Sequence, residues 1–166
     1  DLGFRTGLYT SPHLVRFGER IQVDRRILSD ENLARLVSEL RQRMPPDLQP
    51  TFFEFTTVVA LMAFAEQQVD LVIWETGLGG RLDATNIVTP LASVITSIGL
   101  DHMQVLGNTV GEIATEKAGI IKPGIPVLTA VDRADALEVL RYRARELDSH
   151  CVDRKSTRLN SSHIPL

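Results

Sequence analysis

The stretch "DLVIWETGLGGRLDATN", residues 70–86, sets an apolar run directly against a carboxylate and then three glycines within four residues. The run "VDLVIW" (69–74) is continuous rather than alternating, which is typical of a strand buried on both faces of a parallel sheet. Glu75 follows at the end of this strand, where open α/β sheets bind their ligands. The stretch therefore predicts the binding edge of an α/β fold.

Further strands and helices alternate along the chain. Two more continuous apolar runs, "LASVITSI" (91–98) and "IPVLTA" (125–130), predict buried strands. Helical patterns precede and separate them: a helix capped by Ser29 and ended by Pro45 and Pro46, a second over about 53–67, a third opened by the capping box "TVGE" (109–112) and stopped at Gly119, and an amphipathic fourth over 133–148. This order predicts an α/β fold with an open, mainly parallel doubly wound sheet and helices on both faces.

Composition narrows the class of protein. The 166 residues are 43% hydrophobic and 23% charged with a net charge of -3, which suits a globular domain with a real core. No apolar run approaches the roughly 18 residues of a membrane span. The mild acidity argues against nucleic acid as a partner. The single cysteine, Cys151, excludes an internal disulfide and favours a reducing cytoplasm. We expect a monomer.

The two ends of the chain differ from its middle. The chain begins at Asp1, and residues 3–10 are typical of a turn followed by a strand, so we expect an element before them. Residues 153–166 are polar and lack periodicity, and we interpret them as a non-native or unstructured tail. The predicted domain is therefore residues 1–152.

The glycines after Glu75 permit close approach of the backbone to a ligand. Gly77, Gly79 and Gly80 tolerate positive φ, but "GLGG" is neither a dinucleotide-binding fingerprint nor a phosphate loop. A carboxylate at Glu75 is able to hold a cation or simply to cap an exposed turn, and the residues alone leave both interpretations open.

The next predicted strand ends in Asp101 and His102, at the same sheet edge as Glu75 if the strands are parallel. A single histidine is more often a surface residue than a metal ligand, and Mg²⁺ prefers oxygen donors. Lys117 lies within a predicted helix among small neighbours. Such a lysine usually extends its stem and solvates its ammonium group, and the alternative is a lysine held near a site.

Five motifs together resemble one known family. "GLYTSPHLVRFGERI" (7–21), "FFEFTT" (52–57), "ETGLGGRLDATN" (75–86), "SIGLDH" (97–102) and "EKAGIIKPG" (116–124) are similar to the folylpolyglutamate synthase/dihydrofolate synthase family of the Mur-ligase superfamily. The resemblance covers about residues 2–150, in order. It implies part of a central ATP-binding domain.

The resemblance also implies roles for individual residues. In this family the glutamate of the "GLGG" segment and the histidine of the "DH" pair bind magnesium, here Glu75 and His102, and the lysine of "EKAG", here Lys117, is carbamylated. Ser11 resembles a further metal-site residue. The implied substrate-binding residues are Ser11, Pro12 and His13, and those that shape the glycine loop are Gly77, Gly79, Gly80, Asp83 and Asn86.

The implied reaction uses ATP and Mg²⁺ to activate a carboxylate of dihydropteroate or folate as an acyl phosphate, which the amine of L-glutamate then attacks. The chain lacks the family's phosphate loop, which should lie upstream of Leu2, and the C-terminal domain should follow residue 150. We therefore expect the isolated chain to be inactive. Two alternatives are another Mur-type ligase, against which "TSPHL" and "GGRLDATN" argue, and a non-catalytic nucleotide-binding module.

Overall fold

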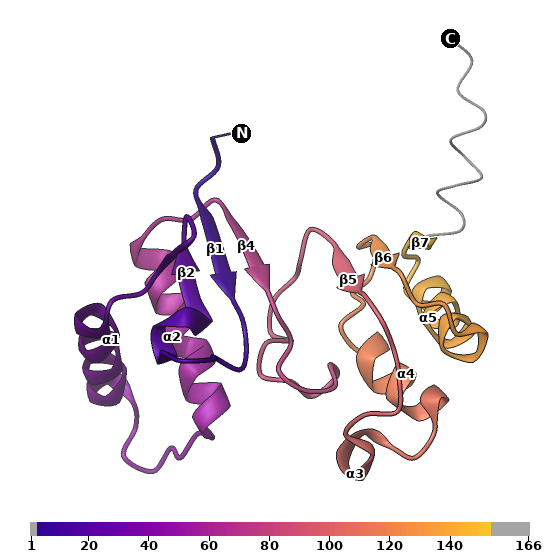
Figure 1. The fold of residues 1–166 in the computed structure, drawn as a ribbon, viewed down its shortest axis with the longest axis horizontal. Coiled ribbons are helices and arrows are strands. Elements are labelled where there is room, and N and C mark those ends of the chain that lie inside the picture. Colours follow the sequence, from indigo (N-terminus) through magenta and orange to yellow (C-terminus); the bar gives the residue numbers. More distant parts are fainter. Residues whose placement is uncertain (1–2, 154–166) are drawn as a thin grey trace. The chain divides into compact units, whose positions relative to one another are not determined.

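The computed structural model describes residues 3–153, and the chain divides into two compact units. Unit 1 ends at Gly77 and unit 2 begins at Leu78 (Figure 1). Each unit has its own sheet and its own core, so each is described by itself. Residues 154–166 of the predicted tail lie outside the described residues. The single domain expected over residues 1–152 stays a prediction.

Unit 1 is built on a four-stranded sheet in the order β3-β2-β1-β4. In this sheet β1 pairs in parallel with β4 and antiparallel with β2, and β2 pairs antiparallel with β3. The elements in chain order are β1 (Thr6–Tyr9), the 3₁₀ helix η1 (Phe17–Arg20), β2 (Ile21–Val23), β3 (Arg26–Ile27), α1 (Asp30–Arg43), α2 (Phe52–Glu66) and β4 (Leu71–Trp74).

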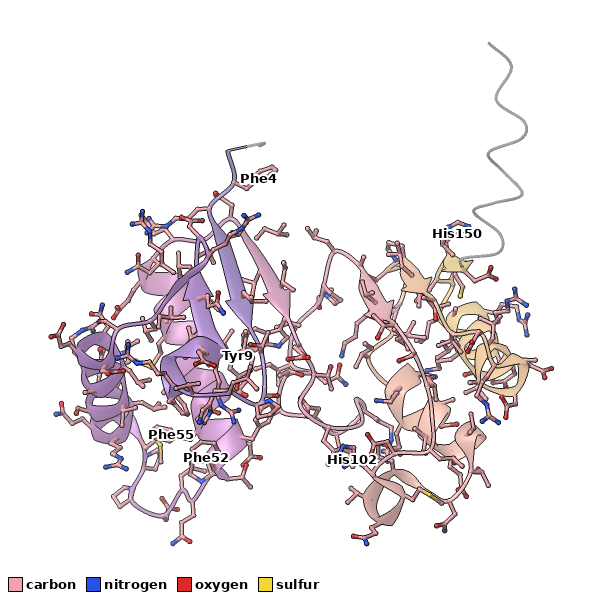
Figure 2. The ribbon with its side chains drawn as sticks, in the orientation of Figure 1. Phe4, Tyr9, Phe52, Phe55, His102 and His150 are labelled. Carbon is pink, nitrogen blue, oxygen red and sulfur yellow. The ribbon has the colours of Figure 1, made fainter. Side chains whose placement is uncertain are left out.

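The core of unit 1 lies between one face of this sheet and the helices α1 and α2. Tyr9 and Ile21 lie opposite each other on neighbouring strands, are fully buried, and pack in one cluster with Leu36 of α1. The Tyr9 side chain points from β1 to α2 (Figure 2), where its hydroxyl lies 3.2 Å from the hydroxyls of Thr56 and Thr57. These two hydrogen bonds satisfy the polar end of a buried aromatic ring.

Unit 2 contains a fully parallel sheet in the order β5-β6-β7. Its elements are β5 (Ser93–Ile95), α3 (Met103–Leu106), α4 (Val110–Ala118), β6 (Val127–Thr129), α5 (Ala134–Glu146) and β7 (Cys151–Asp153). Ile95 and Val127 face a core that also contains Ile113 of α4 and Leu140 of α5. The helices thus cover the face of the sheet that carries these residues.

The helix starts follow the predicted capping signals. Ser29 accepts a hydrogen bond from the backbone N–H of Asn32 at the start of α1, which confirms it as the N-cap. Thr109 and Glu112 form the predicted capping box of α4. The open α/β class is confirmed as well, with a mixed sheet in unit 1 and a parallel sheet in unit 2. No helix of the described residues is long and apolar enough to cross a membrane.

Burial of the strands on both faces, predicted from their continuous apolar runs, is not found within either unit. Ile73 of β4 is 61% exposed, and Val94 of β5 and Leu128 of β6 are 59% and 43% exposed. Successive side chains of a strand point to opposite faces, and in each unit the core residues lie on one face only. The apolar residues of the other face therefore stay exposed within their own unit.

The sheet to which two strand ends belong, and the residue at which the last strand ends, differ from what the sequence predicts. The strand tips expected to share one sheet edge belong to different sheets, because β4 is part of unit 1 and β5 of unit 2. Asp153, assigned from the sequence to the tail, is the last residue of β7, where it is buried and forms an ion pair with Arg141. A three-residue strand at the end of the apolar pattern is too short to be recognised by periodicity.

Candidate functional site

In unit 1 the parallel pairing of β1 with β4 brings two of the predicted site residues together. Tyr9 is in register with Trp74, so the chain leaves both strands at the same edge of the sheet. The backbone N–H of Glu75 donates to the carbonyl of Tyr9 at 3.0 Å, and the backbone N–H of Ser11 donates to Oε2 of Glu75 at 2.8 Å. The Glu75 carboxylate is exposed, so it lies open at the strand ends.

The segment after β1 carries the three residues expected to bind substrate. Ser11 and His13 are half-buried and Pro12 is exposed, and the peptide bond between Ser11 and Pro12 is cis. The next two side chains, Leu14 and Val15, are almost entirely exposed. This segment therefore presents a short polar run and an apolar pair next to Glu75.

The 3₁₀ helix η1 holds this segment through two residues to which the sequence assigned no role. The Glu19 carboxylate accepts hydrogen bonds from the backbone N–H groups of Leu14, Val15 and Arg16, and the N–H groups of Leu14 and Arg16 contribute most to lowering the pKa of Glu19. Arg20 donates from Nε to Nδ1 of His13. Both residues belong to the quoted motif "RFGERI", but only the folded loop shows what they bind.

The glycine loop begins in unit 1 with Gly77. A Cβ atom at this position would lie 2.4 Å from the ring of Phe53 in α2, so the close packing of the loop on this ring requires glycine. The rest of the loop lies in unit 2, where Gly79 has a φ of +71° and is buried. Gly80 approaches the backbone of α4, since a Cβ there would lie 2.7 Å from the carbonyl oxygen of Glu116.

Asp83 and Asn86 organise the second half of the loop by hydrogen bonds. The Asp83 carboxylate accepts from the backbone N–H groups of Leu78 and Thr85, at 2.8 and 2.9 Å. The Asn86 side-chain amide donates to the carbonyl oxygens of Arg81 and Gly119, at 3.0 and 3.1 Å. These bonds tie the loop to itself and to the end of α4.

The loop and the end of α4 are further joined through Arg81. Its backbone N–H donates to the carbonyl of Glu116, and its guanidinium donates to the carboxylate of the same residue. A Cβ on Gly119 would lie 2.3 Å from Cβ of Arg81. Gly119 has a φ of -62°, so it serves close packing here and is not the left-handed helix stop that glycine often provides. "GGRLDATN" and "EKAG" thus form one interlocked structure.

Lys117 lies in the last turn of α4, next to Glu116, and is half-buried. Among residues 3–153 its ammonium group has neither a hydrogen-bond nor an ion-pair partner. His102 is exposed, has a φ of +50°, and lies 3.6 Å from the Asp101 carboxylate through Nε2. Both residues belong to unit 2, whereas Ser11 and Glu75 belong to unit 1.

The donors of unit 1 fit a hard divalent cation. Glu75 uses Oε2 to accept from Ser11, and its exposed carboxylate together with the Ser11 hydroxyl offers the oxygen ligands that Mg²⁺ prefers. The imidazole of His102 fits this chemistry less well, and its assignment depends on the family resemblance. Within the described part of the chain, no three or more His, Cys, Asp or Glu side chains form a group that could hold a metal ion.

Comparison with known proteins identifies the relatives of this chain. No family model matches it. It is 51% identical over 150 residues to the dihydrofolate synthase/folylpolyglutamate synthase of Bacillus subtilis, an alignment that covers 87% of this chain and 35% of that protein.

Two solved structures agree with this relationship. A folylpolyglutamate synthase in complex with AMPPCP and folate has a TM-score of 0.86 at 40% identity, covering 91% of this chain and 38% of that one. The bifunctional folylpolyglutamate synthase/dihydrofolate synthase of Yersinia pestis, complexed with AMPPNP and a Mn ion, has a TM-score of 0.83 at 38% identity, covering 91% and 36%. The chain spans little more than a third of the length of these relatives. Over that span, it belongs to the folylpolyglutamate synthase/dihydrofolate synthase family.

Proposed function

We propose that the protein containing this chain is an ATP-dependent ligase that adds L-glutamate to dihydropteroate, to folylpolyglutamate, or to both. The observation that carries the proposal is the 40% identity and TM-score of 0.86 to a protein solved with AMPPCP and folate. The residues quoted for the resemblance include Ser11 and Glu75, which lie together at the ends of β1 and β4. The proposed site thus occupies the strand ends where α/β sheets bind ligands.

In the proposed reaction the side chains supply charge and position rather than a nucleophile. Formation of the acyl phosphate and attack by the glutamate amine both develop negative charge on phosphoryl and acyl oxygens. Mg²⁺ bound with ATP would neutralise this charge, and the Mn ion in the Yersinia pestis enzyme supports a divalent metal. Glu75 and Ser11 would offer oxygen ligands to the metal in unit 1. The metal-binding role of His102 is carried over from the family.

We propose that Lys117 acts as a carbamate. Its ammonium group would lose a proton, and the neutral amine would then add carbon dioxide and release a second proton, which converts a cationic side chain into an anion with two acceptor oxygens. The absence of a partner for its ammonium among residues 3–153 is consistent with a side chain whose partners are the bound ligands. The interlocked loop and helix end would then keep this group in a fixed place through Arg81 and Gly119.

The substrate segment would be Ser11, Pro12 and His13, next to Glu75. Its neighbours Leu14 and Val15 are exposed and would add apolar surface for the flat ring system of a pterin. We further propose a reducing cytoplasmic location, since Cys151 is the single cysteine of the sequence, and a monomeric enzyme.

The test is an assay of the complete protein that contains this chain. We expect ADP to form only when Mg²⁺, L-glutamate and either dihydropteroate or a reduced folate are all present, with a product heavier by one glutamyl residue in mass spectrometry. Turnover with a cell-wall amino-acid precursor instead would support another Mur-type ligase. ATP binding without turnover on any carboxylate would support a non-catalytic nucleotide-binding module.

A further inference from the structure

The segment between β1 and η1 is held from within by a single carboxylate. Glu19 accepts from the backbone N–H groups of Leu14 at 2.9 Å, Val15 at 3.2 Å and Arg16 at 2.8 Å. Three donors converging on one acceptor group fix the backbone of this segment and give these amides partners within the protein. The residues just before it, Ser11 to His13, are thereby anchored on one side.

The next residue, Arg20, is buried between two aromatic rings. Its guanidinium carbon lies 5.7 Å from the centroid of Phe17 and 5.8 Å from that of Phe52, which Figure 2 labels at the start of α2. The faces of both rings attract the cation, and the rings also restrict where it can point. From this position Nε donates to Nδ1 of His13 at 2.9 Å.

This hydrogen bond determines where the proton of His13 resides. A guanidinium has only donors, so Nδ1 of His13 must be the acceptor. An imidazole that accepts at Nδ1 carries its proton on Nε2. Among the described residues none accepts a hydrogen bond from Nε2 of His13, so the structure leaves this N–H as a donor for another molecule.

We propose that Arg20 is a positioning residue that fixes His13 in the tautomer with its proton on Nε2, so that His13 donates a hydrogen bond to an acceptor atom of the folate-class substrate. Glu19 holds the backbone of the same segment in place. This inference rests on the proposed function, in which Ser11 to His13 meet the substrate. Substrates of this class carry suitable acceptors, namely ring nitrogens, carbonyl oxygens and carboxylates.

The tautomer can be measured directly on the 166-residue chain. Two-bond proton–nitrogen correlation spectra of histidine-labelled protein distinguish a protonated from an unprotonated ring nitrogen, and His13→Gln identifies the signals of His13 by their loss. We expect Nδ1 of His13 to be unprotonated, and Arg20→Met, which keeps an unbranched apolar stem between the rings, to give a mixture of tautomers. Arg35→Met, which removes an arginine paired with Glu66, is the control and should leave the spectrum of His13 unchanged.

Two results in these spectra would overturn the inference. One is a proton on Nδ1 of wild-type His13, with or without a second proton on the ring. The other is a tautomer that stays the same in Arg20→Met. The first result needs no variant, so the inference remains testable even if Arg20→Met does not fold.

Kinetics of the complete protein test the contact with substrate. The side-chain amide of His13→Gln can place a donor near the position of Nε2, whereas that of His13→Asn reaches only the position of Nδ1. We expect His13→Asn and Arg20→Met each to raise KM for the folate substrate about fivefold to tenfold, the loss of one hydrogen bond, with kcat and the KM for ATP unchanged, and we expect a smaller rise in KM for His13→Gln than for His13→Asn.

The double variant separates positioning from a general structural role. If Arg20 acts through His13, Arg20→Met adds nothing to the KM of His13→Asn. Fully additive effects, or an equal loss in kcat and in the affinity for every substrate, would refute the inference. Failure of the proposed function is distinguishable from these outcomes, because the complete wild-type protein would then show no glutamate-dependent turnover whatever the tautomer of His13.

Discussion

At the scale of single residues, the candidate residues of each unit combine a fixed backbone with accessible charged atoms. Glu75 keeps an exposed carboxylate although one of its oxygens accepts from Ser11. Lys117 is half-buried and has no partner for its ammonium within residues 3–153. Accessible charged atoms on a fixed backbone suit the binding of a metal ion or of a charged substrate.

Replacement of Glu75 by glutamine tests the proposed metal ligand. Glutamine keeps the size of the side chain and can still accept from Ser11, but it loses the charge that holds a divalent cation. In the complete protein we expect Glu75→Gln to abolish turnover, with a loss of at least roughly 100-fold, at an unchanged unfolding midpoint. Glu39→Gln, at an exposed ion pair of α1, is the matched control. Near-normal activity of Glu75→Gln at ordinary magnesium concentration would rule out the ligand role.

Substitutions of Lys117 distinguish a carbamate from an ordinary surface lysine. A solvated lysine replaced by alanine changes stability by no more than about 0.5 kcal/mol, whereas loss of a carbamate should lower turnover strongly without unfolding the protein. We expect acetate to restore part of the activity of Lys117→Ala, because it supplies two oxygens of the same charge. Lys117→Arg should stay inactive, since a guanidinium does not form the carbamate. The measurement is turnover of the complete protein against acetate concentration, and full activity of both variants without acetate would exclude the carbamate.

At the scale of elements, α4 connects the glycine loop to the core of unit 2. Its first turn is set by the capping box of Thr109 and Glu112, and its last turn is fixed against Arg81. Because both ends are held, the helix can fix the position of Lys117 within unit 2. The strength of each end can be tested separately.

The close approach at Gly119 predicts a loss of stability on enlargement. A Cβ there would overlap the backbone and Cβ of Arg81, so we expect Gly119→Ala to destabilise the chain by about 1–3 kcal/mol. Gly111→Ala in the same helix is the control, because a Cβ there meets no atom within 4 Å, and it should stabilise by up to about 1 kcal/mol. Urea unfolding of both variants makes the comparison. Equal effects of the two substitutions would contradict the packing role of Gly119.

The first turn of α4 predicts a pH dependence of stability. Hydrogen bonds from the backbone N–H of Asn108, then from the backbone and side chain of Thr109, lower the pKa of Glu112 in the folded state. The stabilisation is therefore fully present above the ordinary glutamate pKa and is lost as the pH falls through the lowered folded pKa. Glu112→Gln retains the capping geometry without the charge.

Urea unfolding of wild type and Glu112→Gln at several acidic pH values measures this effect. We expect wild type to be the more stable form near neutral pH and its advantage to disappear below the folded pKa, which carbon NMR of the Glu112 carboxyl locates. Glu138→Gln on α5, outside any capping box, should leave the pH dependence of wild type in place. The same pH dependence in wild type and Glu112→Gln would exclude a contribution from this carboxylate.

At the scale of the whole molecule, the sequence predicts what depends on local signals. The cap at Ser29 and the capping box of α4 are local and were predicted. The hairpin of β2 and β3 was missed, because its strands are very short and its turn at Asp24 and Arg25 has positive φ without the usual glycine. Asp24 is held there by the backbone N–H of Thr6, a contact that is remote in sequence.

The same distinction applies to the candidate site. The pairing of Glu75 with the segment after β1 follows from two strands that end at one edge, but their pairing is a property of the fold. The hydrogen bonds of Glu19 and Arg20 to the segment after β1 were not predictable, since charged residues on a short helix are usually solvated. Only the tertiary structure shows these contacts, because Arg20 is buried and three backbone N–H groups donate to Glu19 in the folded protein.

The glycine loop also predicts what the 166-residue chain does by itself. A phosphate loop offers free backbone N–H groups and a lysine to its nucleotide, and the sequence contains no G-x-x-x-x-G-K-[S/T] segment. In the loop that follows β4, the N–H of Leu78 is already bound to the Asp83 carboxylate and that of Arg81 to the carbonyl of Glu116. Asp83 also adds a negative charge that repels phosphate.

We therefore expect the 166-residue chain to bind ATP only weakly, with a Kd on the order of 1 mM or above, and to catalyse no ligation. Calorimetric titration with ATP and Mg²⁺ measures the binding, and ADP formation in the presence of dihydropteroate and L-glutamate measures the reaction. The Bacillus subtilis enzyme, assayed in parallel, is the positive control. The weak binding of ATP is expected because the backbone N–H groups of Leu78 and Arg81 already have hydrogen-bond acceptors within the protein. Asp83→Asn removes the repelling charge but keeps an oxygen acceptor, so it should tighten ATP binding only slightly. Turnover of the 166-residue chain at a rate near that of the control would show that phosphate is bound by residues to which we assign no such role.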